Sequence, residues 1–488
     1  MSTKALKITL DRLPYGEDPK ESDLKVTRTL PRGVKNKELY RDIVRIAWPS
    51  FIELLLTQLA SMVDLMMVGS MGGEVHPEIG EQALAAVGMT TQPKFLLMTA
   101  FIAMNTGVTA LVARSKGQGD KEQANLIVRQ GLLFTFIVTV ILSALGMIFA
   151  RPMVIFMGST EEIVTKWATQ YMQIQMAGFL TMALTSTVTA ALRAVGDSRT
   201  CMVYNLVANL VNVVFNWLLI FGNLGFPEMG VAGASLATVI GQLVAFVMAF
   251  RVLIKGNGFL KLDLKKGFRP NRQALGSMLN IGFPAMVEQL LMRAGVIIFT
   301  KTIAGLGTSA YATHQVCMNI LALSFMTGQA FAVSASALVG QSLGKRRSDM
   351  AQAYCSRCRT LGLGTALILT VIFIFFGGEL VALYNKSTAV VSTGSVIMLF
   401  VAFMQPFQTS QFIVAGGLRG AGDTRSTAVI TLVTILIMRP VLAIALVKAG
   451  YGLYGAWAAF VSDQMVRTLL VLLRYNSGKW KLIKVKGK

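Results

Sequence analysis

The chain is 488 residues long; 54% of them are hydrophobic and only 14% are charged. Soluble domains carry about 25% charged residues, so this composition excludes an ordinary soluble protein. The formal net charge is +22, and its distribution along the chain decides whether nucleic acid or membrane topology accounts for it.

Long apolar runs recur along the whole chain, for example at 132–149 and 361–378. Each is about long enough to cross a hydrocarbon core of roughly 30 Å at 1.5 Å per helical residue. Backbone amides in hydrocarbon must be satisfied within the segment, so these runs are helices. The sequence therefore predicts an all-α polytopic membrane protein with about a dozen such runs, read as twelve transmembrane helices.

The first forty residues are polar and basic, and no apolar stretch precedes Arg45. We therefore expect no cleaved signal peptide and interpret 1–40 as a cytoplasmic tail that need not be ordered.

Basic residues cluster in alternate loops. The loops at 261–272 and 344–350 are rich in lysine and arginine, whereas 69–82 and 222–230 contain neither. This alternation is the pattern of membrane topology, in which basic loops stay in the cytoplasm. It predicts a multi-pass protein of the cell (plasma) membrane with both termini cytoplasmic, and it argues against nucleic acid as a partner.

The sequence repeats itself. "ALRAVGDSRT" at 191–200 returns as "GLRGAGDTRS" at 417–426, and 48–72 aligns with 283–307. Each half holds an even number of helices, so the halves are parallel six-helix repeats, a transporter architecture with sites near the midplane between the repeats. The glycines of the repeated phrase suit a tight turn, and its arginines would anchor a cytoplasmic loop. The expected organisation is a cytoplasmic tail at 1–40, an N-terminal lobe at 41–255, a cytoplasmic inter-lobe loop at 256–275, a C-terminal lobe at 276–475 and a basic cytoplasmic tail at 476–488.

Together the duplicated "LRxxGD(S/T)R", the "VDLMMVG" after a proline-led first helix, "ATHQV" at 312–316 and "RP" at 439–440 resemble the multidrug and toxic compound extrusion (MATE) transporters. The resemblance covers about 40 to 486. It implies a twelve-helix antiporter with a V-shaped cavity, which exports organic cations and other amphipathic drugs in exchange for sodium ions or protons. It implies a small-molecule drug or cationic metabolite as partner, a monomer in the lipid bilayer, and no cofactor beyond the coupling Na⁺ or H⁺.

Asp64 is the clearest ionisable residue inside a predicted span, and such groups are functional by default because lipid makes them costly. The resemblance makes it the cation-coupling carboxylate, with Asn212, Asn216 and Thr238 as partners. Four oxygen ligands would suit sodium, while a proton would need only Asp64. The alternatives are that Asp64 caps its helix or faces outer water, and that the two asparagines only join helices.

The C-terminal lobe departs from one branch of the family, whose second cation site would fall at Met292 and Gln408. We therefore expect no such site there. Arg439 and Asp463 are predicted to form a structural ion pair.

Candidate residues for the substrate cavity come from several helices. Glu53 and Glu288 occupy equivalent places in the two lobes and either flank an inward-facing cavity or are wet at the cytoplasmic surface. Gln405 and Gln408 are predicted polar handles of the cavity, and Met292 is a predicted lining residue.

The chain shows no nucleophile elbow, metalloprotease motif or nucleotide-binding loop, so we expect a transporter driven by an ion gradient and not an enzyme. The alternative function is a flippase for a lipid-linked oligosaccharide, which unpaired Arg293, Lys301 and Arg439 in one cavity would favour. Glu288 could instead neutralise Arg293.

His314 is interpreted as a packing residue. The C-x-x-C at 355–358 lacks a second ligand pair, so no metal site is expected.

Overall fold

The computed structural model describes residues 8–17, 24, 30–31, 33–73, 76–159, 161–256, 258–263, 267–384 and 387–483. Its helices form two lobes. The N-lobe comprises α2 (Asn36–Gly69), α3 (Pro77–Gln118), α4 (Lys121–Ile148), α5 (Ala150–Phe156), α6 (Glu162–Ala177), α7 (Phe179–Ala194), α8 (Ser198–Phe221), η2 (Asn223–Gly225) and α9 (Gly230–Lys255). The C-lobe comprises α10 (Arg272–Ala304), α11 (Thr308–Gly344), α12 (Ser348–Tyr384), α13 (Thr388–Ala421), α14 (Thr424–Thr431), η4 (Leu432–Met438), α15 (Arg439–Leu446), η5 (Val447–Tyr451) and α16 (Gly452–Asn476). The short α1 (Thr9–Arg12) and η6 (Lys479–Leu482) lie outside the two bundles.

The helices make twelve passes. In the described part of the chain, ten are long and apolar enough to cross a membrane, or eleven when α6 and α7, bent by 49° at Gly178, count as one span. One of the ten is a 53-residue run, Thr424–Asn476. The chain turns back within it, because Gly450 and Gly452 have φ of 93° and 52°, which break the helix. This run is therefore two passes, which completes the predicted twelve.

The eleventh pass is irregular for a local reason. Two π-helical segments, η4 and η5, flank α15, whose second residue is Pro440. Proline lacks the N–H that an α-helix would use, and a wider turn accommodates the lost bond.

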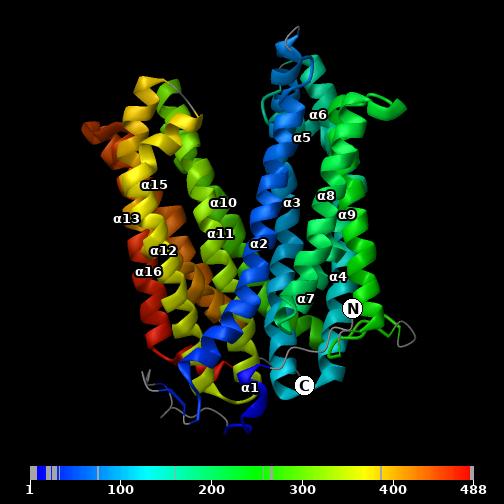
Figure 1. Cartoon of the computed structure of the whole chain (residues 1–488), viewed down its shortest axis with the longest axis vertical. Coiled ribbons are helices and arrows are strands. Elements are labelled where there is room, and N and C mark those ends of the chain that lie inside the picture. Colours follow the sequence, from blue (N-terminus) through cyan, green and yellow to red (C-terminus); the bar gives the residue numbers. More distant parts are fainter. Residues whose placement is uncertain are drawn as a thin grey trace.

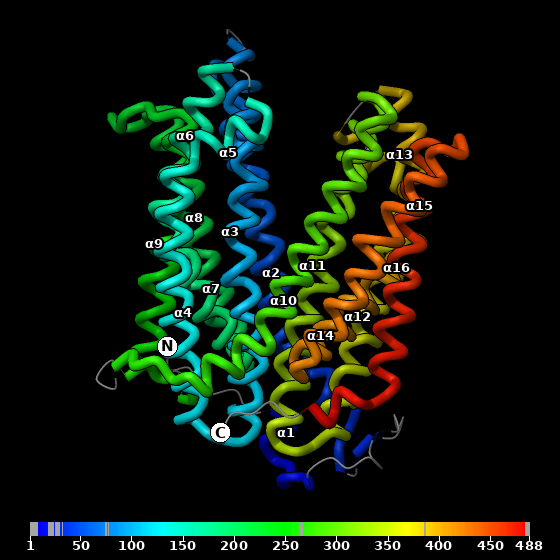
Figure 2. Tube along the Cα trace, turned by 180° about the vertical axis from the view of Figure 1, so that it is seen from behind, coloured from blue at the N-terminus to red at the C-terminus, as the bar shows by residue number. Residues whose placement is uncertain are grey.

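The two lobes form a V (Figure 1). They meet at the end that carries α1 and η6, here named the terminal end, and diverge toward the opposite, distal end. The same separation is visible from behind (Figure 2). The helices that join the lobes are α2 and α3 on one side and α10 and α11 on the other.

Small residues let the lobes approach closely at the terminal end. A Cβ on Gly117 of α3 would lie 1.9 Å from the carbonyl oxygen of Gln341, and one on Gly344 of α11 would lie 2.0 Å from that of Arg114. Gly117 and Gly344 occupy equivalent positions of the repeat. The junction is therefore reciprocal, with each lobe presenting a glycine to the backbone of the other.

The first helix of each lobe begins against the other lobe. The buried Ile43 and Ile46 of α2 share a core cluster with C-lobe residues such as Leu338. Conversely, Met278 and Ile281 of α10 belong to the main N-lobe cluster. The lobes are thus interlocked through α2 and α10. The predicted boundary between the lobes at 256–275 gave no indication of these exchanged contacts.

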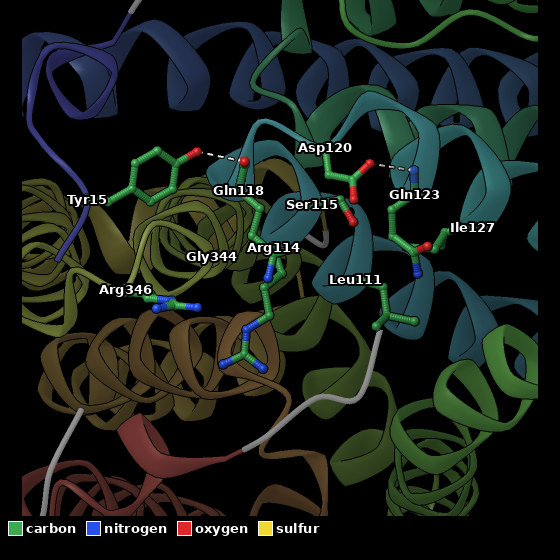
Figure 3. Close-up of a pocket in the computed structure, with 10 residues that line it drawn as sticks. All are labelled: Tyr15, Leu111, Arg114, Ser115, Gln118, Asp120, Gln123, Ile127, Gly344 and Arg346. Carbon is green, nitrogen blue, oxygen red and sulfur yellow. Dashed lines mark hydrogen bonds between the residues drawn. The ribbon is translucent and has the colours of Figure 1, made fainter. Parts of the chain in front are cut away.

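The segment Ile8–Gly16, which belongs to the predicted cytoplasmic tail, packs across the junction and is here named the terminal brace. Its Leu10 is buried, and the Leu10 carbonyl accepts a bond of 2.8 Å from Lys345 Nζ of the C-lobe. Tyr15 Oη donates a bond of 2.6 Å to the carbonyl of Gln118 in the N-lobe (Figure 3).

The other end of the chain makes a matching contact. Trp480 is buried against Tyr475, and Arg114 of α3 donates a bond of 3.0 Å to the carbonyl of Ile483. Each terminal segment therefore reaches the lobe to which it does not belong in sequence.

Candidate functional site

The predicted cation-coupling residues converge in the distal half of the N-lobe. Asn216 of α8 donates a hydrogen bond from Nδ2 to Asp64 of α2. The Asn212 amide nitrogen donates to the two Asp64 oxygens at 2.9 and 3.3 Å, and its oxygen accepts a bond of 3.3 Å from the Thr238 N–H. Helices α2, α8 and α9 thus supply one carboxylate, two amides and a hydroxyl to one place.

One acceptor in this cluster is left over. Asn216 Oδ1 is buried and has no hydrogen-bond partner in the described part of the chain. A buried oxygen without a donor is costly, whereas a cation between it and Asp64 would satisfy it. The arrangement can therefore accept a monovalent cation, and it does not hold Asp64 as a helix cap.

The two asparagines belong to a longer ladder. Asn205 donates to Glu53 at 2.5 Å and Asn209 donates to Thr57 at 3.3 Å, and Asn216 repeats the pattern with Asp64. Every pair is separated by 152 residues, so α8 runs parallel to α2 with its asparagines on one face. The positions 205, 209, 212 and 216 have helical spacing, a signal that was present in the sequence.

A lysine of α3 is bonded to the helices beside this cluster. Lys94 Nζ donates a hydrogen bond of 2.8 Å to Gln175 Oε1 on α6, and Gln175 Nε2 bonds the carbonyl of Ser235 on α9 at 3.4 Å. Lys94 and Asp64 act on each other electrostatically. Lys94 could have been identified in the sequence by the same rule as Asp64, because both are ionisable residues in an apolar span.

Glu53 and Glu288 are buried in matching ion pairs. Arg193 lies 2.7 Å from Glu53 Oε1, and Arg419 lies 2.5 Å from Glu288 Oε1. Glu288 also accepts a bond of 2.8 Å from Thr427. The alternative that these carboxylates are wet at the cytoplasmic surface is therefore wrong, because only 6% and 5% of the two residues is exposed. In this conformation they also do not face an open cavity.

The repeated phrase thus has a role beyond anchoring a loop. Arg193 and Arg419 lie in the last turns of α7 and α13, and each neutralises a carboxylate of the first helix of its lobe. Gly196 and Gly422 follow with φ of 88° and 90°, the left-handed conformation that favours glycine, and reverse the chain. The aspartates then begin the next helices. Asp197 Oδ1 accepts a bond of 3.3 Å from the Thr200 N–H, and Asp423 pairs with Arg474 at 2.7 Å.

The C-lobe charges are largely engaged. Arg439 pairs with Asp463 as expected, and Arg467 joins the same carboxylate oxygen at 2.9 Å. Arg293 does not meet Glu288; its guanidinium lies 4.5 Å from the centre of the Phe95 ring on α3. Lys301 is exposed near the end of α10. The three cations are not gathered unpaired in one cavity.

Other candidates are buried by packing. Gln405 and Gln408 are 0% and 1% exposed, so neither reaches an open cavity in this conformation, while Met292 is half-buried. His314 lies edge-on between Phe299 and Trp457, at 5.7 and 5.6 Å between ring centres. Cys355 and Cys358 are buried free thiols. The described residues contain no group of three acidic, histidine or cysteine side chains placed to hold a metal ion.

A pocket of about 570 Å³ lies at the terminal end, beside the brace (Figure 3). Its lining includes Tyr15, Arg114, Gln118 and Arg346. It is distant in the fold from the Asp64 cluster, which lies toward the distal end of α2 and α8.

Comparison with known proteins places these features in context. A family model described as MatE matches residues 49–218 and 284–444. The "Probable multidrug resistance protein NorM" of Thermotoga maritima is 27% identical over 445 residues, covering 91% of this chain and 93% of the relative. The "Multidrug resistance protein MdtK" of Yersinia pestis is 26% identical over 440 residues, covering 89% and 94%.

Solved structures share the architecture. A crystal structure of MATE in complex with MaD3S superposes with a TM-score of 0.82 at 21% identity, covering 93% of this chain and all of that one. An outward-facing conformation of a multidrug resistance MATE family transporter of the MOP superfamily gives 0.83 at 20% identity with the same coverage. At this identity the likeness establishes the fold.

Proposed function

The chain belongs to the MatE family of membrane transporters, and on this premise we propose that it is a secondary antiporter which exports organic cations and other amphipathic drugs in exchange for sodium ions or protons. The observation that carries the proposal is the cluster of Asp64, Asn212, Asn216 and Thr238. A carboxylate inside a span, with an unused amide oxygen beside it, has the chemistry of a coupling-cation site. The names of the NorM and MdtK relatives support drugs as the substrate class.

The orientation follows from charge. Lys345, Arg346 and Arg347 follow α11 at the terminal end, and Lys116 and Lys121 lie there on α3 and α4. Basic segments next to spans remain in the cytoplasm, which supports a cytoplasmic terminal end in the plasma membrane. The V then opens outward, and the junction of Gly117 with Gly344 closes the inner side. A single chain contains both lobes and the cluster, so we infer that a monomer transports.

Coupling would act through α2. Bare Asp64 accepts a hydrogen bond from the Asn212 nitrogen, whereas a sodium ion bound there would need the Asn212 oxygen, so the amide would turn over as that ion comes and goes. Because the asparagine ladder holds α2 along α8, a change at Asp64 alters the packing of the whole helix. The start of α2 lies against the C-lobe, so this change is transmitted to the junction about which the lobes rock.

The test is transport in inside-out vesicles with ethidium outside them. Uptake of the dye is followed under an imposed sodium gradient and then under a proton gradient, for the wild type and Asp64→Asn. Gradient-driven uptake in the wild type that is lost in the variant supports the proposal. The absence of uptake with either gradient, in protein that elutes as a folded species, would refute drug antiport and favour the lipid-linked flippase.

A further inference from the structure

We propose that Lys94 sets the ion selectivity of the Asp64 cluster, because its ammonium group takes the electrostatic place of a bound monovalent cation and disfavours sodium. The inference rests on the proposed function, in which this cluster receives the coupling cation. It adds a residue from α3 to the cluster and names the ion that the cluster rejects.

Lys94 is bonded through Gln175 to a helix that carries part of the Asp64 cluster. Its Nζ bonds Gln175, Gln175 bonds the carbonyl of Ser235, and Ser235 lies one helical turn before Thr238 on α9. The Thr238 N–H in turn donates to the Asn212 oxygen at 3.3 Å, and the Asn212 nitrogen donates to Asp64. Lys94 is therefore joined by hydrogen bonds to α6 and, through Gln175, to α9, and the contact on α9 lies one helical turn from the residues around the carboxylate.

The charges in the cluster already balance. The hydrogen-bond partner of Lys94 Nζ is the neutral amide of Gln175, and the acidic group that acts on it is Asp64. From the helices around Asp64, the titratable groups that act on it or respond to it are Lys94 of α3 and Tyr171 of α6. Helices α8 and α9 contribute only neutral amides and a hydroxyl. One carboxylate and one ammonium group therefore give a neutral cluster before any ion arrives.

Sodium would be the second cation beside one carboxylate. Because Asp64 and Lys94 are both half-buried, repulsion between two unit charges in one cluster is only partly screened and opposes binding by roughly tenfold or more. The alternative role for Lys94 is structural, as a bridge between α3 and α6. That role predicts a loss of stability on substitution and no gain of sodium binding.

The experiment measures equilibrium binding of ²²Na⁺ to purified protein in detergent, and it needs no transport. The wild type is compared with Lys94→Met, which keeps the length of the side chain and removes its charge, and with Lys94→Arg, which keeps the charge. We expect Lys94→Met to bind sodium at least about tenfold more tightly than the wild type, and Lys94→Arg to resemble the wild type. Adding Asp64→Asn to Lys94→Met should abolish the gained binding. Elution of each variant as a single species shows that it is folded, and Lys94→Gln is a second neutral variant if the methionine variant is not.

Two results would overturn the inference. One is sodium binding of equal affinity in the wild type and the neutral variants, which would show that Lys94 does not oppose the ion. The other is an absence of sodium binding in every folded variant, which would show that something other than Lys94 excludes it. Neither result depends on drug uptake, so failure of the proposed antiport remains separately visible in the vesicle assay.

Discussion

Gly117 of α3 and Gly344 of α11 face each other's helices across the junction of the lobes, and each lies within contact distance of a carbonyl where no Cβ fits. The two residues are equivalents in the repeat. The junction thus depends on the absence of a side chain at two related positions, and it holds the terminal end closed while the distal end is open.

Gly344→Ala should separate the lobes at the terminal end. A methyl group 2.0 Å from the Arg114 carbonyl forces backbone to move, which costs about 1–3 kcal/mol in a packed region. We expect a lower midpoint of thermal unfolding in detergent. Gly364→Ala in α12 is the matched control, because nothing lies within 4 Å of its added Cβ and it should leave the midpoint unchanged or slightly raised. Equal midpoints for the two variants would contradict this account of the junction.

Breaking the Glu288–Arg419 pair should destabilise the C-lobe. Arg419→Met leaves a buried carboxylate with only Thr427 as a partner, and we expect a loss of about 2–3 kcal/mol, reduced by the partial exposure of the arginine. Adding Glu288→Gln should recover part of the loss, because no unpaired charge then remains. Thermal unfolding of the single and double variants measures this, and a double variant less stable than Arg419→Met alone would show that the charge is not the cause.

Asn216→Leu should impair ion coupling more than the same substitution at Asn209, which lies in the neighbouring pair of the asparagine ladder. Asn216 contacts Asp64 directly, whereas Asn209 contacts only the hydroxyl of Thr57. We expect gradient-driven dye uptake to fall by roughly tenfold or more for Asn216→Leu, the effect of losing a charge-assisted hydrogen bond. Asn209→Leu is the control and should retain most of its activity. If both variants transport equally well, the ladder serves packing alone.

Lys345→Met should release the terminal brace. The lysine donates hydrogen bonds to the carbonyls of Leu10 and Asp11, at 2.8 and 3.3 Å, and its loss leaves them without this donor. We expect faster amide hydrogen exchange in the brace and a loss of about 1–3 kcal/mol in stability. Exposed Lys448 offers a control, since Lys448→Met removes the same charge outside the brace. Unchanged exchange in Lys345→Met would mean that other contacts hold the segment.

The sequence was sufficient for the architecture and for part of the cluster. Apolar length defined the passes, repetition defined the lobes, and an aspartate in a span indicated Asp64. The spacing of Asn212 and Asn216 placed both on one face of α8, and the structure brings that face to α2.

The remaining features depend on contacts between distant segments. Glu53 meets Arg193, and Glu288 meets Arg419, across 140 and 131 residues, distances over which local patterns carry no information. Lys94 carried a readable signal, but nothing in the sequence places it near Asp64. The terminal brace binds partly through backbone carbonyls, which are the same for every residue type, and partly through Ile8 and Leu10, whose short apolar pattern does not indicate the lobe they pack against.

The terminal brace also constrains the order of assembly. Ile8–Gly16 is synthesised more than three hundred residues before Lys345, which donates to the Leu10 carbonyl, and before Tyr354, which shares the Asp42 carboxylate with the Thr9 N–H. The brace therefore completes its contacts only after α10, α11 and the start of α12 have been translated. Docking of the brace is therefore a late step of biogenesis, because it requires both lobes to be in contact.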